Sequence, residues 1–220
     1  MPHPDRHTYP DRYAYPDRYA YPDRFYPVVD SVAWVARLAL LGAGTIQLRA
    51  KNLDDAEALQ LVGDALDIIR GTPAKLVVND YWRVAIKAGA KHLHLGQEDL
   101  VDADLNAIRD AGLTLGLSTH DDEELENALR AKPDYIALGP IFPTTLKSMR
   151  FAPQGIAKIT EWKRRIGNIP LVAIGGIKLE AAREIFVAGA DSIAVVCDVT
   201  QNAEPDARVR AWLGLNAEAT

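Results

Sequence analysis

The chain has 220 residues, of which 48% are hydrophobic and 25% are charged, and its formal net charge is −5; these values are typical of one soluble globular domain. The acidic balance argues against a broad nucleic-acid-binding surface, although a few basic side chains could still bind a small anion. The single cysteine excludes an intramolecular disulfide, and no apolar run is long enough to span a membrane, so we expect a cytoplasmic protein without a membrane partner.

A six-residue repeat occupies the start of the chain. The copies that begin at Tyr9, Tyr15 and Tyr21 each read Tyr-Pro-Asp-Arg followed by Tyr or Phe. Because a proline lies beside two opposite charges in every copy, the repeat can continue neither a helix nor a sheet ladder, and we predict an extended or disordered tail over residues 1–24. A tyrosine-rich arm that binds a partner is the alternative. The stretch contains no apolar core of the kind found in secretory signals.

After the repeat, short β-branched runs alternate with amphipathic stretches. This alternation predicts parallel strands joined by right-handed crossover helices. Eight such units fit a single α/β domain, a closed (β/α)8 TIM barrel over residues 25–220. The predicted strands are 25–29, 45–48, 75–78, 92–95, 114–117, 135–138, 171–174 and 192–196. The predicted helices are 31–41, 54–69, 81–88, 102–110, 121–130, 154–166, 179–188 and 205–212.

Glycines between the predicted elements support the barrel. Gly44, Gly89, Gly112 and Gly189 each follow a helical stretch and precede a strand, where glycine commonly ends a helix. A doubly wound open sheet is the rival fold. Such a sheet usually has fewer strands and a glycine-rich turn after its first strand. Here the turn after the first predicted strand begins with Asp30 and Ser31 and contains no glycine. We therefore favour the barrel.

The second strand leads into a basic motif at the end where barrels of this kind carry their chemistry. Alternation turns Gln47, Arg49 and Lys51 to the same side. Arginine offers a fork of donors and lysine a point charge, so the motif is either an anion clamp or a solvated basic loop. The residues alone leave both interpretations open.

Carboxylates follow the third and fourth strands. Asn79 and Asp80 end the third strand, and Asp99 follows the fourth. Two carboxylates at neighbouring strand ends beside cations suggest Mg²⁺, which is commonly held by one or two carboxylates together with substrate phosphate oxygens. A helix cap before Tyr81 is the alternative role for Asp80. The sequence contains no Cys/His cluster at zinc spacing.

Further polar residues follow the fifth and sixth strands. Ser118 and His120 end the fifth strand, and His120 is either a proton-transfer residue or a structural one. The long loop at residues 139–153 carries Thr144, Thr145 and Lys147 and could close over an anion as a lid.

The ends of the last two strands indicate a phosphate site. Gly175 and Gly176 follow the seventh strand and leave backbone amides accessible to a ligand. Together with the end of the eighth strand, at Val196 and Cys197, they occupy the place where many barrels hold a phosphate.

Five ordered motifs resemble those of the thiamine phosphate synthase family. The motifs begin at Gln47 (Gln-Leu-Arg-Ala-Lys), Val78 (Val-Asn-Asp), His94 (His-Leu-Gly-Gln-Glu-Asp), Gly139 (Gly-Pro-Ile-Phe-Pro-Thr) and Ala173 (Ala-Ile-Gly-Gly-Ile). The resemblance covers residues 25–199. It implies a transferase that joins hydroxymethylpyrimidine diphosphate to hydroxyethylthiazole phosphate and releases diphosphate and thiamine phosphate.

The resemblance also implies roles for single residues. Asp80 and Asp99 would bind Mg²⁺, while Gly176 and the backbone near Val196 would bind the thiazole phosphate. The pyrimidine would leave as a resonance-stabilised cation, so that the thiazole nitrogen could attack without a protein nucleophile. The pyrimidine diphosphate would contact Gln47, Arg49, Lys51, Asn79, Ser118, Thr144 and Lys147, of which Arg49, Lys51, Ser118 and Lys147 would take part in catalysis.

Two positions depart from the family pattern. Leu146 stands where the lid usually has a second threonine, and Cys197 stands where the eighth strand often ends in serine. Loss of one donor can slow an enzyme by about 10²–10³, so Leu146 would leave a slow enzyme.

Two other functions are alternatives. One is a thiazole tautomerase of the same barrel family, in which His120 would transfer a proton; the diphosphate clamp argues against it, because isomerisation needs none. The other is a non-catalytic barrel that binds thiazole phosphate or thiamine phosphate. A homo-oligomer is compatible with the sequence in every case.

Overall fold

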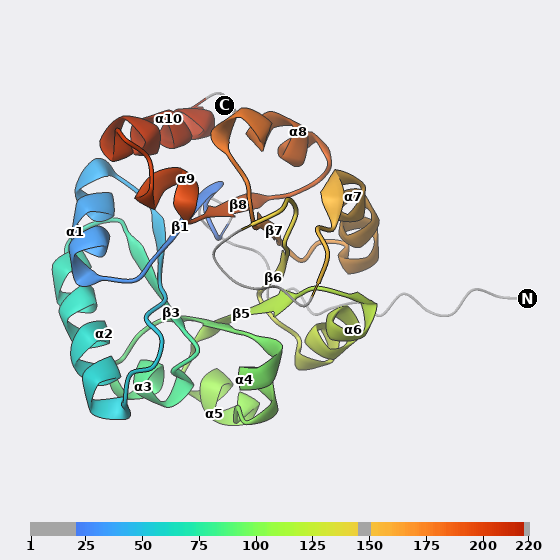
Figure 1. Cartoon of the computed structure of the whole chain (residues 1–220). Helices are drawn as coiled ribbons and strands as arrows, with labels where there is room; N and C mark the ends of the chain where they lie inside the picture. The colour runs from blue at the N-terminus through green and yellow to red at the C-terminus, as the bar shows by residue number, and fades with distance from the viewer. Residues whose placement is uncertain (1–20, 145–150, 218–220) are drawn as a thin grey trace, which may run out of the picture.

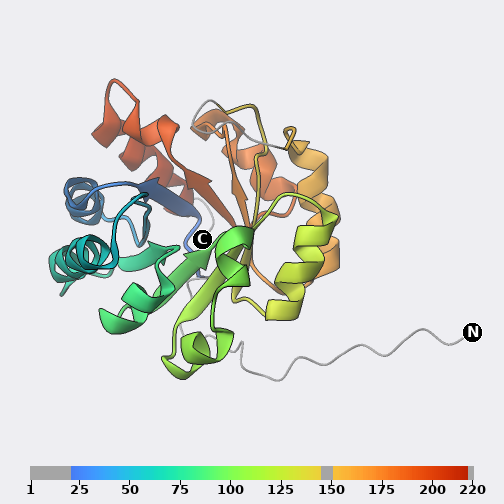
Figure 2. The same ribbon diagram turned by 60° about the horizontal axis from the view of Figure 1, so that its bottom comes forward.

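The computed structural model describes residues 21–144 and 151–217. They form a closed barrel of eight parallel strands, in which each strand pairs with the next and β8 returns to β1. Figures 1 and 2 show the helices around the strands from two directions. The predicted barrel is confirmed, and each strand lies where the alternation placed it to within two residues. The strands are β1 (Phe25–Val29), β2 (Thr45–Leu48), β3 (Lys75–Asn79), β4 (His92–Leu95), β5 (Thr114–Thr119), β6 (Tyr135–Leu138), β7 (Leu171–Ile174) and β8 (Ser192–Val195).

The helices follow the strands along the chain and form the outer ring (Figure 1). Over the described ranges, none of them combines the length and the apolar character that a membrane crossing requires. They are α1 (Val32–Leu41), α2 (Asp55–Ile69), α3 (Trp82–Lys87), α4 (Gln97–Val101), α5 (Leu105–Asp110), α6 (Asp122–Ala131), α7 (Gly155–Ile166), α8 (Ala182–Val187, after a 3₁₀ turn at Leu179–Ala181), α9 (Cys197–Thr200) and α10 (Pro205–Ala217).

Some helix boundaries differ from the prediction. The helix predicted from residue 102 begins at Leu105, because the Asp104 carboxylate accepts hydrogen bonds from the first N–H groups of α5. Helices α4 and α9 have only five and four residues, too few to produce a helical period in the sequence. The end of α1 is capped by Gly42, with φ 93°, and not by Gly44 as predicted.

Outward-facing residues of the strands form the core beneath the helices. On β4, Leu93 and Leu95 are fully buried in it, as alternation along a strand requires. The Trp212 ring of α10 stacks on Phe25 of β1 with 5.6 Å between the ring centroids. The last helix therefore packs on the first strand and helps to close the ring.

The last copy of the repeat covers the N-terminal end of the barrel. Tyr21 is buried there, and its ring stacks on His92 with 4.6 Å between the centroids. The Thr45 hydroxyl donates to the Asp23 carboxylate at 2.6 Å, and the Ser192 hydroxyl donates to the Asp23 backbone oxygen at 2.6 Å. Residues 21–24, which we predicted as part of the tail, thus lie against the barrel; residues 1–20 lie outside the described part.

Polar side chains lie inside the barrel toward the C-terminal ends of four neighbouring strands. They are Gln47 of β2, Asn79 of β3, His94 of β4 and Ser118 of β5. Their position is the one expected for a binding site in this fold.

Candidate active site

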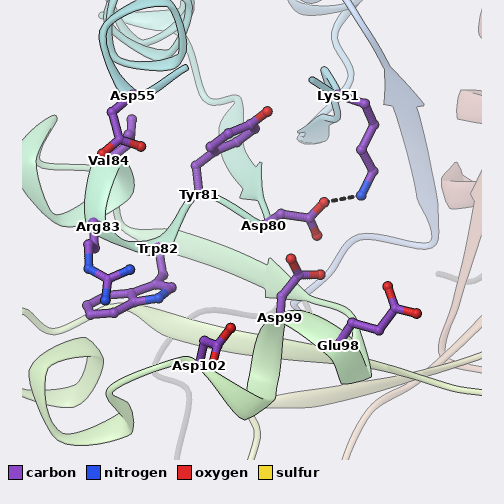
Figure 3. A pocket seen from close by; sticks show the side chains of 10 residues that line it. All are labelled: Lys51, Asp55, Asp80, Tyr81, Trp82, Arg83, Val84, Glu98, Asp99 and Asp102. Carbon is purple, nitrogen blue, oxygen red and sulfur yellow. Dashed lines mark hydrogen bonds and ion pairs between the residues drawn. The ribbon is translucent and has the colours of Figure 1, made fainter. Parts of the chain in front are cut away.

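A cavity of about 480 Å³ opens beside the loops that follow β3 and β4. Figure 3 shows the carboxylates of Asp80 and Asp99 directed toward each other, with the Lys51 ammonium beside Asp80. The sequence analysis placed these three residues in one site, and the structure brings them together. The lining residues are Lys51, Asp55, Asp80, Tyr81, Trp82, Arg83, Val84, Glu98, Asp99 and Asp102.

Asp80 follows β3 in a left-handed backbone conformation, with φ 69°. Its N–H donates to the backbone oxygen of His94 at 2.9 Å, which holds the turn against β4. The side chain then forms an ion pair with Lys51. The alternative role as a helix cap is wrong, because Tyr81 precedes α3 and that helix begins without a side-chain cap.

Asp99 lies in the first turn of α4 and faces Asp80. Burial raises the pKa of the Asp99 carboxyl above its usual range, and the negative charge and hydrogen bond of Asp80 raise it further. Lys51 acts in the opposite direction but more weakly. The two carboxylates therefore repel each other when both are ionised.

This carboxylate pair fits a divalent cation. Two carboxylates supply the protein share of a typical Mg²⁺ site, in which water and substrate phosphate oxygens complete the coordination. Within residues 21–144 and 151–217, no group of three or more His, Cys, Asp or Glu side chains is arranged to hold a metal. The geometry thus suits a metal held partly by a phosphorylated ligand and does not suit a cage made by the protein alone.

The residues of the Gln47-Leu-Arg-Ala-Lys51 motif lie in different places: Gln47 lies inside the barrel, and Lys51 lies at the carboxylate pair. Gln47 is buried, and its Nε2 donates to Tyr26 Oη at 2.7 Å. Arg49 is exposed, and its positive charge helps to lower the pKa of His94. With Lys51 on Asp80, both cations act on the region of β3 and β4.

His94 is a site residue that the sequence analysis used only within a motif. It is 5% exposed, and its ring nitrogens lie 2.9 Å from Tyr135 Oη and 2.8 Å from Ser118 Oγ. Burial is the main cause that lowers the pKa of His94 to about 4, so its imidazole is neutral at pH 7. The alternation of His92-Leu-His-Leu could have placed it inside the barrel, but its partners lie on distant strands.

Asn79 pairs with His94 across the ladder between β3 and β4. It is 4% exposed, and its Nδ2 has no hydrogen-bond partner among the described residues. A buried amide donor without an acceptor costs free energy. An acceptor on a bound ligand would remove that cost.

His120 lies at the end of β5, apart from the carboxylate pair. Its Nδ1 lies 2.7 Å from the Glu124 carboxylate, and its backbone N–H donates to the same oxygen at 2.8 Å. The ring stacks on Phe151 with 4.8 Å between the centroids. These contacts favour the structural role over proton transfer.

The glycine pair after β7 supports the start of the long loop. A Cβ on Gly175 would lie 2.6 Å from Pro140 Cα, and one on Gly176 would lie 2.4 Å from the Pro143 oxygen. Gly176 is nevertheless exposed, with φ 66°. Glycine is therefore needed here for close packing as well as for access to the backbone.

Of the remaining predicted residues, some lie in loops after the strands, and the others lie outside the described residues. Thr144 is half-buried at the start of the long loop, and Val196 is half-buried immediately before α9. Thr145, Leu146 and Lys147 lie outside the described residues.

The family model described as "Thiamine monophosphate synthase" matches residues 24–199. A thiamine-phosphate synthase from Rhizobium etli is 52% identical over 193 residues, which cover 88% of this chain and 95% of that protein. One from Salmonella agona is 51% identical over 196 residues, which cover 88% of this chain and 93% of that protein.

Solved structures agree with these matches. A thiamine phosphate pyrophosphorylase from Pyrococcus furiosus superposes with a TM-score of 0.75 at 30% identity and covers 89% of this chain and 96% of its own. A 3-hexulose-6-phosphate synthase from Salmonella typhimurium has a TM-score of 0.69, covers 90% and 100%, and is only 13% identical. The second likeness shows the fold alone.

Proposed function

The chain belongs to the thiamine monophosphate synthase family, and from that premise we propose that it is a thiamine-phosphate synthase. The reaction joins hydroxymethylpyrimidine diphosphate to hydroxyethylthiazole phosphate and releases diphosphate. The enzyme is a transferase that acts on small molecules. The observation that carries the substrate assignment is the facing pair Asp80 and Asp99 with Lys51 beside it, because a tautomerase needs no such site for a diphosphate.

Asp80 and Asp99 would hold Mg²⁺, which would neutralise negative charge on the diphosphate as it departs. Arg49 and Lys51 add positive charge on the same side. Charge on the leaving group grows as the bond breaks, so these cations stabilise the transition state more than the intact substrate. Lys147 would add a further cation from the long loop.

The protein needs no nucleophile for the substitution. The pyrimidine would separate as a resonance-stabilised cation, and the thiazole nitrogen, held close to it, would form the new bond. Burial raises the pKa of the Cys197 thiol, so this residue stays protonated at pH 7 and is a poor nucleophile. The binding of two substrates in the correct relative position is the main task of the site.

We place the thiazole phosphate at the backbone of Gly176 and near Val196. Gly176 is exposed with a positive φ, and loops after the last strands commonly bind phosphate in this fold. The phosphate groups of the two substrates would thus lie on opposite sides of the barrel mouth, with the reacting atoms between them.

An assay of the purified chain with both substrates tests the function. We expect thiamine phosphate to form in the presence of Mg²⁺, as measured by mass spectrometry. No thiamine phosphate should form when EDTA has removed the metal. The Rhizobium etli relative serves as the positive control. No product from this chain, under conditions where the relative is active, would refute the proposal.

A further inference from the structure

A chain of hydrogen bonds crosses the barrel interior from β2 to β5. Gln47 Nε2 lies 2.7 Å from Tyr26 Oη, which lies 2.8 Å from Tyr135 Oη. Tyr135 Oη lies 2.9 Å from His94 Nδ1, and His94 Nε2 lies 2.8 Å from Ser118 Oγ. The first four residues are buried, whereas Ser118 is half-buried at the C-terminal end of its strand. The bonds therefore run from the packed interior to a half-buried hydroxyl at the C-terminal end of the barrel, where sites in this fold lie.

The donors and acceptors in this chain fix its direction. The Gln47 amide nitrogen can only donate, so Tyr26 Oη accepts from it. Among the described residues, Tyr135 Oη is the acceptor within reach of the Tyr26 proton. Tyr135 then gives its own proton to His94 Nδ1. The opposite direction would leave the buried Tyr26 proton without an acceptor, which costs free energy.

The direction decides what Ser118 can do. Because His94 Nδ1 accepts, the ring proton of the neutral imidazole lies on Nε2 and is donated to Ser118 Oγ. The Ser118 hydroxyl proton then points away from His94. The Ser118 hydroxyl can therefore donate to an acceptor other than His94.

Gly116 makes this arrangement sterically feasible. A Cβ at Gly116 would lie 1.9 Å from Cζ of the Tyr135 ring. Gly116 pairs with Tyr135 on one side and with His94 on the other. The Tyr135 ring therefore crosses over the backbone of β5, and its hydroxyl reaches β4.

We propose that His94 is a positioning residue that, through this chain of bonds, holds Ser118 as a hydrogen-bond donor to an acceptor atom of the pyrimidine diphosphate. The substrate identity rests on the proposed function, whereas the direction of the bonds does not. Asn79 supports the inference, since its Nδ2 is a second donor next to His94 that no described residue satisfies. Ser118 and Asn79 thus offer two donors near the ends of β5 and β3, and a ligand group that donates at this place would be rejected.

Nitrogen NMR of the histidine rings tests the direction without any substrate. We expect His94 to be protonated at Nε2, with its signals identified by their loss in His94→Gln. In Tyr135→Phe, the Nδ1 donor is lost and the two neutral tautomers should mix. A His94 protonated at Nδ1 in the unaltered protein would overturn the inference. Protonation at Nε2 in a chain that makes no thiamine phosphate would refute the proposed function alone.

Steady-state kinetics test the consequence for the substrate. Tyr135→Phe keeps the ring and should lower kcat/KM for the pyrimidine diphosphate by about tenfold, the value of one buried hydrogen bond, with KM for the thiazole phosphate unchanged. His94→Gln, which keeps an N–H donor, should retain more activity than His94→Leu. Equal activity in these two variants would contradict the role of the donated bond.

The control variant is Thr119→Val. Thr119 is buried on the same strand as Ser118, but its hydroxyl donates to the Ala137 backbone oxygen outside this chain of bonds. We expect its kinetics and the His94 tautomer to be unchanged. A tenfold loss in this variant too would show that any buried hydroxyl on β5 matters, and would remove the case for His94.

Two inhibitors identify the acceptor. Inorganic diphosphate offers phosphate oxygens only, and hydroxymethylpyrimidine offers ring nitrogens without phosphate. Tyr135→Phe should weaken inhibition by one of them about tenfold and leave the other unchanged, which assigns the acceptor to phosphate or ring. Unchanged inhibition by both would overturn the inference.

Discussion

The two ends of the barrel are built from the same strands but differ in how their carboxylates are placed. At the N-terminal end, Asp23 bonds to Thr45 and to Ser192. At the C-terminal end, Asn79 Nδ2 lacks a partner among the described residues, and Asp80 carries a left-handed backbone beside the like charge of Asp99. Unpaired donors and facing carboxylates cost free energy in the free protein. The Asp23 carboxylate is thus hydrogen-bonded within the chain, whereas the facing carboxylates of Asp80 and Asp99 suit a bound cation.

Asp80→Asn should give the largest effect and should act on activity alone. Asparagine keeps the shape and tolerates a left-handed backbone, but it removes the charge that would bind Mg²⁺. We expect kcat/KM to fall by about 10²–10³. The melting temperature should change little, because loss of the ion pair with Lys51 offsets the relief of repulsion by Asp99. Asp104→Asn is the control, because asparagine also caps helices and α5 lies outside the site. Full activity in Asp80→Asn would contradict the metal assignment.

Tyr21→Ala should show the reverse pattern at the N-terminal end. The loss of a buried aromatic side chain should lower the free energy of unfolding by about 3 kcal/mol, as measured by urea denaturation, while kcat/KM of the folded protein stays within about twofold. Leu40→Ala, at a residue that is 89% exposed, should change stability by less than about 0.5 kcal/mol. A Tyr21 variant as stable as Leu40→Ala would show that this end is not closed by the repeat.

Asp99→Asn should raise stability while it lowers activity. Because the folded pKa of Asp99 lies above its ordinary value, the destabilisation is fully present at neutral pH and is relieved as the pH falls through that raised pKa. Without Mg²⁺ at pH 7, the variant should melt at a higher temperature than the unaltered protein. Addition of Mg²⁺ and diphosphate should stabilise only the unaltered protein. A lower melting temperature in the variant would contradict the like-charge repulsion.

His92→Gln should produce the smallest effect, which is a change in the pH dependence of stability. Burial, followed by the charges of Lys75 and Lys91, lowers the pKa of His92 from 6.5 to about 4. Stability is therefore full above the ordinary pKa and falls as the pH drops toward 4. The variant should flatten this fall without removing it, because His94 shifts in the same direction. Urea denaturation between pH 7 and 4.5 measures the slope, and an unchanged slope would contradict the assignment.

Local patterns in the sequence were sufficient for the barrel and for the position of the site. Most strands produced a run of β-branched or other apolar residues, and the residues that follow β2, β3 and β4 include Lys51, Asp80 and Asp99. The ends of parallel strands meet at one end of a closed barrel, so sequence positions could be converted into proximity. The prediction of these three residues as neighbours depended only on that rule.

The remaining features depend on contacts between distant strands. The bonds of His94 to Tyr135 join residues 41 apart in the chain, and the Tyr135 ring fits only because residue 116 is glycine. The hydrophobic periodicity along one strand does not indicate how side chains from different strands fit together. The left-handed conformation of Asp80 likewise comes from its backbone bond to β4, which a propensity for helix caps could not anticipate.

The bond between Ser192 and Asp23 spans 169 residues of the chain. During synthesis, β1 leaves the ribosome long before β8 exists. The edge of β1 that pairs with β8 therefore stays unpaired until most of the protein has been made. Contacts of such long separation slow folding, and an unpaired strand edge is prone to wrong pairing. The seam between the first and last strands is therefore where a nascent copy is most exposed to aggregation.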